Sequence, residues 1–249
     1  NYIAITGALA CIGRAGERPV VPLNLIGDYG GGAVYLAFGI VSALLHASRS
    51  GKGQVVDAAM VDGAISLMAL FYGRHAAGRW KSGRAGNELD GGAPWYDTYK
   101  TKDNRFIAIG AIEPKFFQEL LRRLGVDVAD WPHPEDPSCW PNLRRCFEEA
   151  FGSRTQSEWN DLLQGSEACY APILDLAEAP LHPHNIERKA FIDIEGVSQP
   201  NIAPRFSLTP GEIKRSAPNP GDGGHQALQS WGFSESEIAE MQRLGVAWS

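Results

Sequence analysis

Stretches of the chain that carry almost no charge alternate with stretches rich in glycine and proline. The first uncharged run extends from Ala33 to Ala47; Asp28 and a glycine triplet precede it, and Gly51 follows it. Aspartate suits the N-cap of a helix, and glycine suits the residue just past its end. The run is closer to the length of a core helix than to the roughly 20 apolar residues that cross a bilayer. The pattern therefore predicts a buried helix and no membrane span.

Two more apolar segments follow this predicted helix. Residues 54–58 (Gln-Val-Val-Asp-Ala) have the pattern of a buried strand, and residues 60–77, rich in Ala, Leu and Met, predict a second helix. Between residues 78 and 99 glycines crowd a polar stretch that also contains Pro94. Such a stretch is typical of a long linker, and so of a domain boundary.

Strands and helices alternate again beyond the linker. Residues 105–111 predict a strand, and a helix is expected to begin at Pro114 and to end at Gly125. Further helices are expected over residues 141–151 and 155–164, with a strand near residues 170–175. Prolines between residues 180 and 220 predict an irregular segment. The last predicted helix runs from Ser234 to Leu244, with Ser234 and Glu237 spaced as a capping box.

Composition and charge exclude several classes of protein. The chain has 249 residues, of which 44% are hydrophobic and 21% charged. These values are ordinary for a globular protein and exclude a disordered tail, a coiled coil or a collagen-like fibre. The net charge of −6 leaves the chain without the overall basic character of a nucleic-acid binder, so no nucleic-acid partner is expected.

The cysteines and the chain ends bear on location. Cys11, Cys139, Cys146 and Cys169 include no Cys-x-x-Cys pair, which favours a reducing compartment and argues against a zinc site. The chain opens on Asn1 without a Met or a basic leader, so the true N-terminus is expected upstream. Its last residues do not resemble the peroxisomal Ser-Lys-Leu signal. A cytoplasmic location is expected.

Two carboxylates stand out by position. Asp28 precedes the glycine-rich turn into the first predicted helix, and Glu113 lies between a predicted strand and a helix that begins with proline. Free N–H groups at a helix N-terminus favour an anion, either the carboxylate itself or an oxyanion that forms beside it. The alternative is that both residues only cap helices. The glycine triplet matches no dinucleotide or Walker motif and instead lets a ligand or a neighbouring helix come close.

Several segments together resemble the α-methylacyl-CoA racemases of the class III (formyl-CoA-type) CoA-transferase superfamily. Gly-Lys-Gly-Gln at 51–54 and the region around Asp28 mark the superfamily. Gly-Ala-Ile-Glu-Pro at 110–114 and Asp-Gly-Gly-Ala-Pro at 90–94 are more specific to the racemases. The resembling segments are residues 1–7, 22–32, 51–63, 89–99 and 110–116, and more weakly 168–174 and 203–206.

The resemblance implies an isomerase of lipid and fatty acid metabolism. Such enzymes invert the α-carbon of a 2-methylacyl-CoA thioester by 1,1-proton transfer through an enolate, with two acid/base groups on opposite faces. The resemblance makes Asp28 one of these groups. The other is a His of a Gly-His-Asp-Ile-Asn-Tyr motif that ends in Asn1 and Tyr2, so this His would lie upstream of the chain. Glu113 is expected to support it.

The resemblance also assigns the substrate-binding residues. Asn1 and Tyr2 resemble the end of the acyl-CoA-binding segment, and Asn24 is expected to donate a hydrogen bond near Asp28. No metal and no cofactor is expected, since the CoA belongs to the substrate. Because the chain lacks the His, we expect it to be inactive by itself.

The implied fold is the remainder of a large parallel-sheet α/β domain and a smaller α/β domain, in two subunits interlocked as a homodimer. Residues 1–75 would belong to the large domain, 76–92 to a linker and 93–185 to the small domain. Residues 186–202 would form a second linker, and 203–249 would return to the large domain.

Two other functions fit the same residues. In a class III CoA transferase, the aspartate at the position of Asp28 is a nucleophile that forms a mixed anhydride and then a CoA thioester. Asp28 fits either role, but Glu113 has no obvious task in that mechanism. The second alternative is a non-catalytic assembly or acyl-binding module, because the His is missing from the chain.

Overall fold

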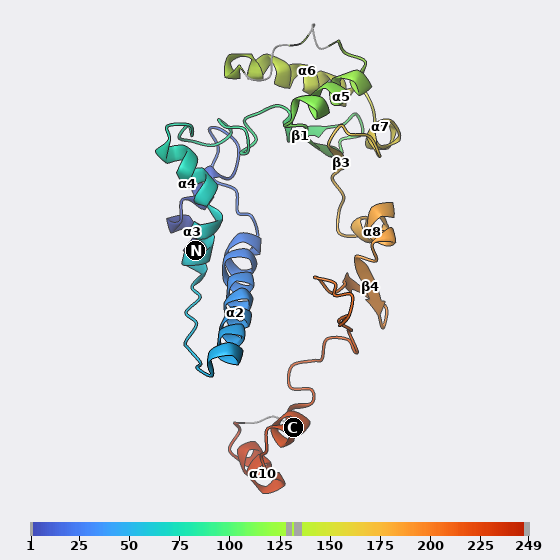
Figure 1. Ribbon diagram of the computed structural model, residues 1–249. Coiled ribbons are helices and arrows are strands. Elements are labelled where there is room, and N and C mark those ends of the chain that lie inside the picture. The colour runs from blue at the N-terminus through green and yellow to red at the C-terminus, as the bar shows by residue number, and fades with distance from the viewer. Residues whose placement is uncertain (1, 128–130, 132–135, 247–249) are drawn as a thin grey trace. The chain divides into compact units, whose positions relative to one another are not determined.

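The structure is a computed structural model that describes residues 2–127, 131 and 136–246 (Figure 1). The helical elements are η1 (Tyr2–Ile5), α1 (Ala8–Cys11), η2 (Leu25–Val34), α2 (Tyr35–Ser50), α3 (Met60–Leu67), α4 (Ala69–Ala76), α5 (Pro114–Leu124), η4 (Pro137–Cys139), α6 (Trp140–Gly152), α7 (Gln156–Leu163), η5 (Ala179–Leu181), α8 (Pro183–Glu187), α9 (Gly224–Ser230) and α10 (Glu235–Arg243). The strands are β1 (Tyr96–Lys100), β2 (Phe106–Gly110), β3 (Tyr170–Pro172), β4 (Phe191–Ile194) and β5 (Val197–Pro200). The chain divides into two compact units, with the boundary between Ile173 and Leu174.

The first unit begins with helices that pack closely through glycine. η2 is π-helical and continues directly into α2, and α3 lies against η2. Gly31 and Gly63 meet at this contact: a Cβ added to Gly63 would overlap the carbonyl oxygen of Gly31. A Cβ added to Gly31 would lie 2.7 Å from the backbone nitrogen of Ala64. Only residues without a side chain allow the two helices to come this close.

The prediction that the apolar run forms a buried helix is correct for the helix and wrong for its burial. α2 has no buried residue, and Phe38 is 73% exposed. Val56 lies against Gly39 on one side of α2, while most of the large apolar side chains of this helix stay exposed. The continuous helix Leu25–Ser50 has 26 residues and is long and apolar enough to cross a membrane. Length and composition alone do not distinguish such a span from a helix that other segments of a protein bury.

The predicted strand over residues 54–58 is wrong. The segment has no strand partner among the described residues, and Val55 is 94% exposed. A strand needs a neighbour for its backbone hydrogen bonds, and the described chain contains no strand before Tyr96. All strand pairs that the structure describes are antiparallel. The predicted parallel sheet therefore has no counterpart in this part of the chain.

The core of the first unit is a three-stranded sheet covered by helices on one face. The strand order is β1-β2-β3, with Tyr96 opposite Gly110 and Ile107 opposite Pro172. Figure 1 shows α5 and α6 on the same side of β1. The largest buried side chains of this core are those of Trp95, Tyr99, Ile107, Phe117, Leu120, Leu121, Leu143, Phe147, Phe151, Trp159 and Leu163.

The predictions for this region are confirmed. The strands and helices expected over residues 105–175 are β2, α5, α6, α7 and β3. Pro114 is the first residue of α5, and Gly125 ends it with a φ of 75°. The helix expected over residues 60–77 also forms, but as α3 and α4, which meet at Met68.

The segment between α4 and β1 is folded around Asp90. The Asp90 carboxylate accepts hydrogen bonds from the backbone N–H groups of Gly86, Asn87 and Gly92. The Asn87 amide also donates to it at 2.8 Å. The stretch that composition marks as a linker thus has internal structure, and the domain limits drawn from the sequence stay a prediction.

The second unit contains the hairpin β4–β5 and short helices. Phe191 pairs with Pro200 in the hairpin. The predicted capping box is confirmed: the Ser234 hydroxyl accepts from the backbone N–H of Glu237, whose side chain accepts from the backbone N–H of Ser234. Ile238 of α10 is buried.

Candidate active site

Asp28 lies in the first turn of η2 rather than at its N-cap, so the predicted cap position is wrong. Asn24 occupies the N-cap, and its carbonyl oxygen accepts the backbone N–H groups of Asp28 and Tyr29, each at 3.2 Å. The helix begins about one turn before the position expected from the sequence. Asp28 nevertheless remains in the first turn of the helix, at the positive end of the helix dipole. Its carboxylate is exposed and has no hydrogen bond or ion pair with any described residue.

The glycines around Asp28 bring other segments close to it. A Cβ on Gly27 would lie 3.1 Å from the side chain of Ile3 in η1, and Gly31 and Gly32 lie against α3. The expectation that these glycines allow a close approach is confirmed for neighbouring helices. As a result, the backbone on both sides of Asp28 is held by packing, while its side chain stays free.

The other predicted residues near Asp28 are described in part. Tyr2 is 60% exposed in η1, which contacts η2. Asn24 is exposed, and its side chain makes no cap hydrogen bond. Asn1 lies outside the described residues. The structure therefore places Tyr2 and Asn24 in the same part of the first unit as Asp28 and leaves their roles untested.

Glu113 is the N-cap residue of α5, but its side chain does not cap the helix. Its backbone carbonyl accepts the N–H groups of Phe116 and Phe117, each at 3.0 Å, while the exposed carboxylate has no partner among the described residues. The charge of Glu113 adds to burial in raising the pKa of the nearby Cys169 thiol. Neither Glu113 nor Asp28 makes the side-chain hydrogen bond that a capping role requires.

No hydrogen bond or ion pair in the described chain joins Asp28 to Glu113. Asp28 belongs to the helices at the start of the first unit, whereas Glu113 lies between β2 and α5. Each carboxylate is thus held on its own element and presented to solvent.

Sequence reasoning missed an apolar cavity beside η2. Its volume is about 380 Å³, and its lining includes Ile26, two positions before Asp28. Burial, followed by the charge of Asp90, raises the pKa of the Cys11 thiol in this lining. The apolar character of residues 60–77 was a signal for packing but not for a cavity. The other lining residues are Ala8, Ile12, Gly13, Ala64, Leu67, Met68, Phe71, Trp80, Leu89 and Asp90.

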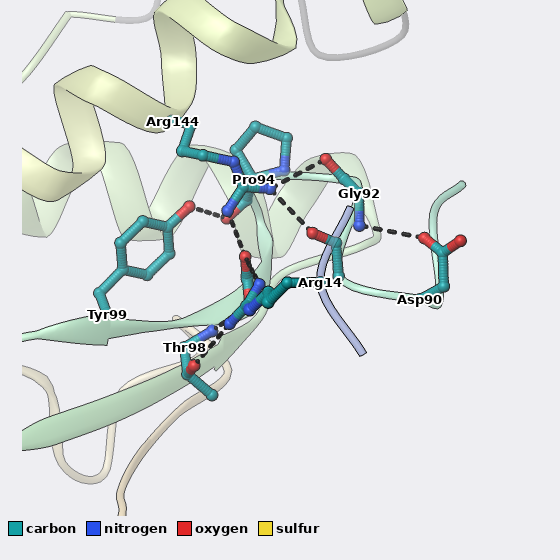
Figure 2. A network of polar contacts seen from close by, with 9 residues as sticks. Arg14, Asp90, Gly92, Pro94, Thr98, Tyr99 and Arg144 are labelled. Atoms are coloured by element: carbon teal, nitrogen blue, oxygen red, sulfur yellow. Dashed lines mark hydrogen bonds and ion pairs between the residues drawn. The ribbon is translucent and has the colours of Figure 1, made fainter. Parts of the chain in front are cut away.

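An ionic network around the buried carboxylate of Asp97 was also not predicted from the sequence (Figure 2). The Asp97 side chain is 4% exposed and lies between the guanidinium groups of Arg14 and Arg144. Arg14 Nη1 donates to Asp97 Oδ2 at 2.8 Å, and Arg144 Nη1 also donates to this oxygen. The Tyr99 hydroxyl donates to the Pro94 carbonyl at 2.6 Å, and burial raises the pKa of Tyr99. The one feature of the sequence that pointed to this region was the Asp-Gly-Gly-Ala-Pro segment, through its resemblance to the racemases.

The residues that the structure describes include no group of three His, Cys, Asp or Glu side chains that could hold a metal ion. All four cysteines are free thiols.

Comparisons with known proteins agree on one family. The family model of CoA-transferase family III matches residues 1–225. The chain is 42% identical to α-methylacyl-CoA racemase of Mus musculus and 40% identical to that of Homo sapiens, in each case over 97% of the chain. It spans 64% of the length of these two relatives. A CaiB/BaiF family protein from Brucella suis has a similar fold, with a TM-score of 0.72, 21% identity, and coverage of 92% of this chain and 61% of that one.

Proposed function

This chain belongs to CoA-transferase family III, and from that premise we propose that it forms part of an α-methylacyl-CoA racemase. The observation that carries the proposal is the 42% identity to the mouse racemase over nearly the whole chain. We further propose that the whole protein is a cytoplasmic homodimer that acts on 2-methylacyl-CoA thioesters in fatty acid metabolism. The CoA is part of the substrate, and the proposal includes no separate cofactor.

Asp28 is proposed as one of the two acid/base groups. Racemisation requires a base to remove the α-proton, an enolate to hold the electron pair, and an acid to return a proton to the opposite face. Nothing is oxidised or reduced, and the substrate keeps its atoms apart from the exchanged proton. A carboxylate that is exposed and lacks an internal partner is available for such a transfer, and Asp28 meets both conditions.

Glu113 is proposed to support the second group, a His upstream of Asn1. Tyr2 and Asn24 are proposed to contact the acyl-CoA, and Asn1 completes that segment. The apolar cavity next to Ile26 has a lining suited to a branched acyl chain, because apolar walls bind such a chain without demanding one shape.

The first prediction concerns the exchange of the α-proton. In the whole protein that contains this chain, we expect the α-proton of a 2-methylacyl-CoA to be replaced by deuterium from the solvent while the thioester is racemised. We expect Asp28→Asn to lower the rate of racemisation by at least about a hundredfold, since an amide cannot take up the proton. Asp62→Asn is the matched control, because Asp62 is also an exposed aspartate in the first turn of a helix, α3. Both rates are measured by NMR and chiral analysis.

Two results would oppose this assignment. Exchange that does not depend on Asp28 removes Asp28 from the mechanism. A covalent acyl or CoA adduct on Asp28, without α-proton exchange, indicates a CoA transferase instead. The sequence upstream of Asn1 gives a further check, because Gly-His-Asp-Ile is expected immediately before it. The chain tested alone is expected to be inactive.

A further inference from the structure

The segment from Asp90 to Asp97 contains the Asp-Gly-Gly-Ala-Pro motif, for which the proposed reaction has no direct use. The Asp90 carboxylate joins this segment to the preceding turn, because it accepts the backbone N–H groups of Gly86 and Asn87 as well as that of Gly92. Arg144 of α6 then donates to the carbonyl oxygens of Gly91 at 2.9 Å and Gly92 at 3.0 Å. The two glycines thus present their carbonyls to one guanidinium.

Asp97 connects this folded segment to a distant part of the chain. Its carboxylate binds Arg144 from α6 and Arg14, which lies just after α1. Figure 2 shows both guanidinium groups at the same end of β1, and Arg14 Nη2 also donates to the Thr98 hydroxyl at 3.1 Å. A carboxylate that is 4% exposed must be paired, because an unpaired buried charge is costly. The two arginines therefore restrict where β1 can lie.

The position of β1 determines that of Glu113. The backbone N–H of Ala111 donates to the carbonyl of Trp95 at 3.0 Å, and Tyr96 pairs with Gly110. Trp95 lies two positions before Asp97, and Ala111 lies two positions before Glu113. We propose that Asp97 is a positioning residue, which through Arg14, Arg144 and the Trp95–Ala111 hydrogen bond fixes the backbone from which the Glu113 side chain extends. This inference rests on the proposed function, in which Glu113 supports the catalytic His.

The kinetic test uses the whole protein that contains this chain. We expect Asp97→Asn to lower kcat by at least about tenfold and to leave KM within about twofold, since the group displaced acts on the chemical step. The kcat of the double variant Asp97→Asn/Glu113→Gln should be no lower than that of Glu113→Gln alone, because both changes remove the same function, that of Glu113. Losses that simply multiply would overturn the inference.

The matched control is Glu119→Gln. Glu119 also binds two arginines, Arg122 and Arg123, but all three residues lie on α5 and none is joined to Asp97. We expect its kcat and KM to match those of the wild type. If Asp97→Asn behaves like Glu119→Gln in an active enzyme, Asp97 has no positioning role. A second variant, Arg14→Met, covers the case that Asp97→Asn fails to fold. The Arg14 side chain is 46% exposed, so its replacement is a milder change, and it should also lower kcat.

A second measurement does not depend on activity. Amide hydrogen exchange at Ala111 should become at least about tenfold faster in Asp97→Asn and Arg14→Met, and should stay unchanged in Glu119→Gln. An unchanged rate at Ala111 in the first two variants would overturn the inference. A wild-type protein without racemisation would instead refute the proposed function, while the exchange rates would still show whether Asp97 holds this segment.

Discussion

Individual residues decide how Asp28 is held. Gly31 and Gly63 let η2 and α3 touch without a side chain between them, and this contact fixes the backbone three positions after Asp28. The Asp28 carboxylate itself has no partner among the described residues, so its orientation is left to whatever binds there. The packed backbone fixes where the Asp28 side chain begins, but an acid/base group also needs a fixed rotamer, which the described residues do not provide.

Replacement of Gly63 tests this contact. A Cβ there would overlap the carbonyl oxygen of Gly31, so we expect Gly63→Ala to lower the free energy of unfolding by about 1–3 kcal/mol, as overpacking does. Gly73→Ala in α4 is the control, because no atom lies within 4 Å of the added Cβ; it should be neutral or stabilising by up to about 1 kcal/mol. Urea unfolding measures both. Equal effects at the two positions would contradict the close contact.

Candidate residues can be found from the sequence where their local chemistry marks them. Asp28 and Glu113 stood out because each precedes or begins a helix. The ionic network could not be found in this way, since Arg14 lies 83 positions and Arg144 47 positions from Asp97. Only the fold brings these three side chains together.

At the scale of elements, local stop and start signals were reliable. Pro114, Gly125 and the Ser234–Glu237 pair act within one turn, so they mark the ends of α5 and the start of α10 in any context. The predicted strand over residues 54–58 failed because a strand depends on a partner. The prediction that α2 is buried was wrong for a similar reason, because burial depends on other segments that pack against the helix.

The stability that the ion pairs of Glu119 contribute on α5 should depend on pH. Hydrogen bonds from Arg122 and Arg123 lower the pKa of Glu119 from 4.5 to about 2. The folded state holds this carboxylate ionised, so the unfolded state takes up a proton first as the pH falls. The contribution is present above pH 4.5 and is lost as the pH falls toward about 2.

Urea unfolding between pH 7 and pH 2.5 checks this. The difference in unfolding free energy between the wild type and Glu119→Gln should shrink below pH 4.5. Glu149→Gln on α6 is the control, because it removes the same charge at a position where no ion pair with a described residue is broken. A difference for Glu119→Gln that stays constant with pH would contradict the expectation.

At the scale of the whole molecule, many large apolar side chains of the described residues are exposed. Among them are Phe38, Val41 and Leu44 of α2, which are 73%, 65% and 62% exposed. Its relatives are longer, and this chain spans 64% of their length. The small sheet with its helices, by contrast, has a complete core of its own.

The chain studied by itself should therefore bind a hydrophobic dye. We expect strong fluorescence with anilinonaphthalene sulfonate, and we expect Phe38→Gln/Leu44→Gln to lower it. Leu208→Gln is the control: Leu208 is 92% exposed but belongs to the second unit, so its loss should change the signal little. A dye signal insensitive to the α2 changes would show that this surface is covered in solution.

The contact between Gly31 and Gly63 also has a genetic consequence. Every amino acid that a single nucleotide change can substitute for glycine is larger, so no missense mutation at either codon can preserve the separation of the two helices. Neither glycine can be replaced by a residue of similar size, whereas a leucine codon can change to one for isoleucine or methionine. Inherited variation at the codons for Gly31 and Gly63 should accordingly lower the amount of folded protein before it affects any chemistry.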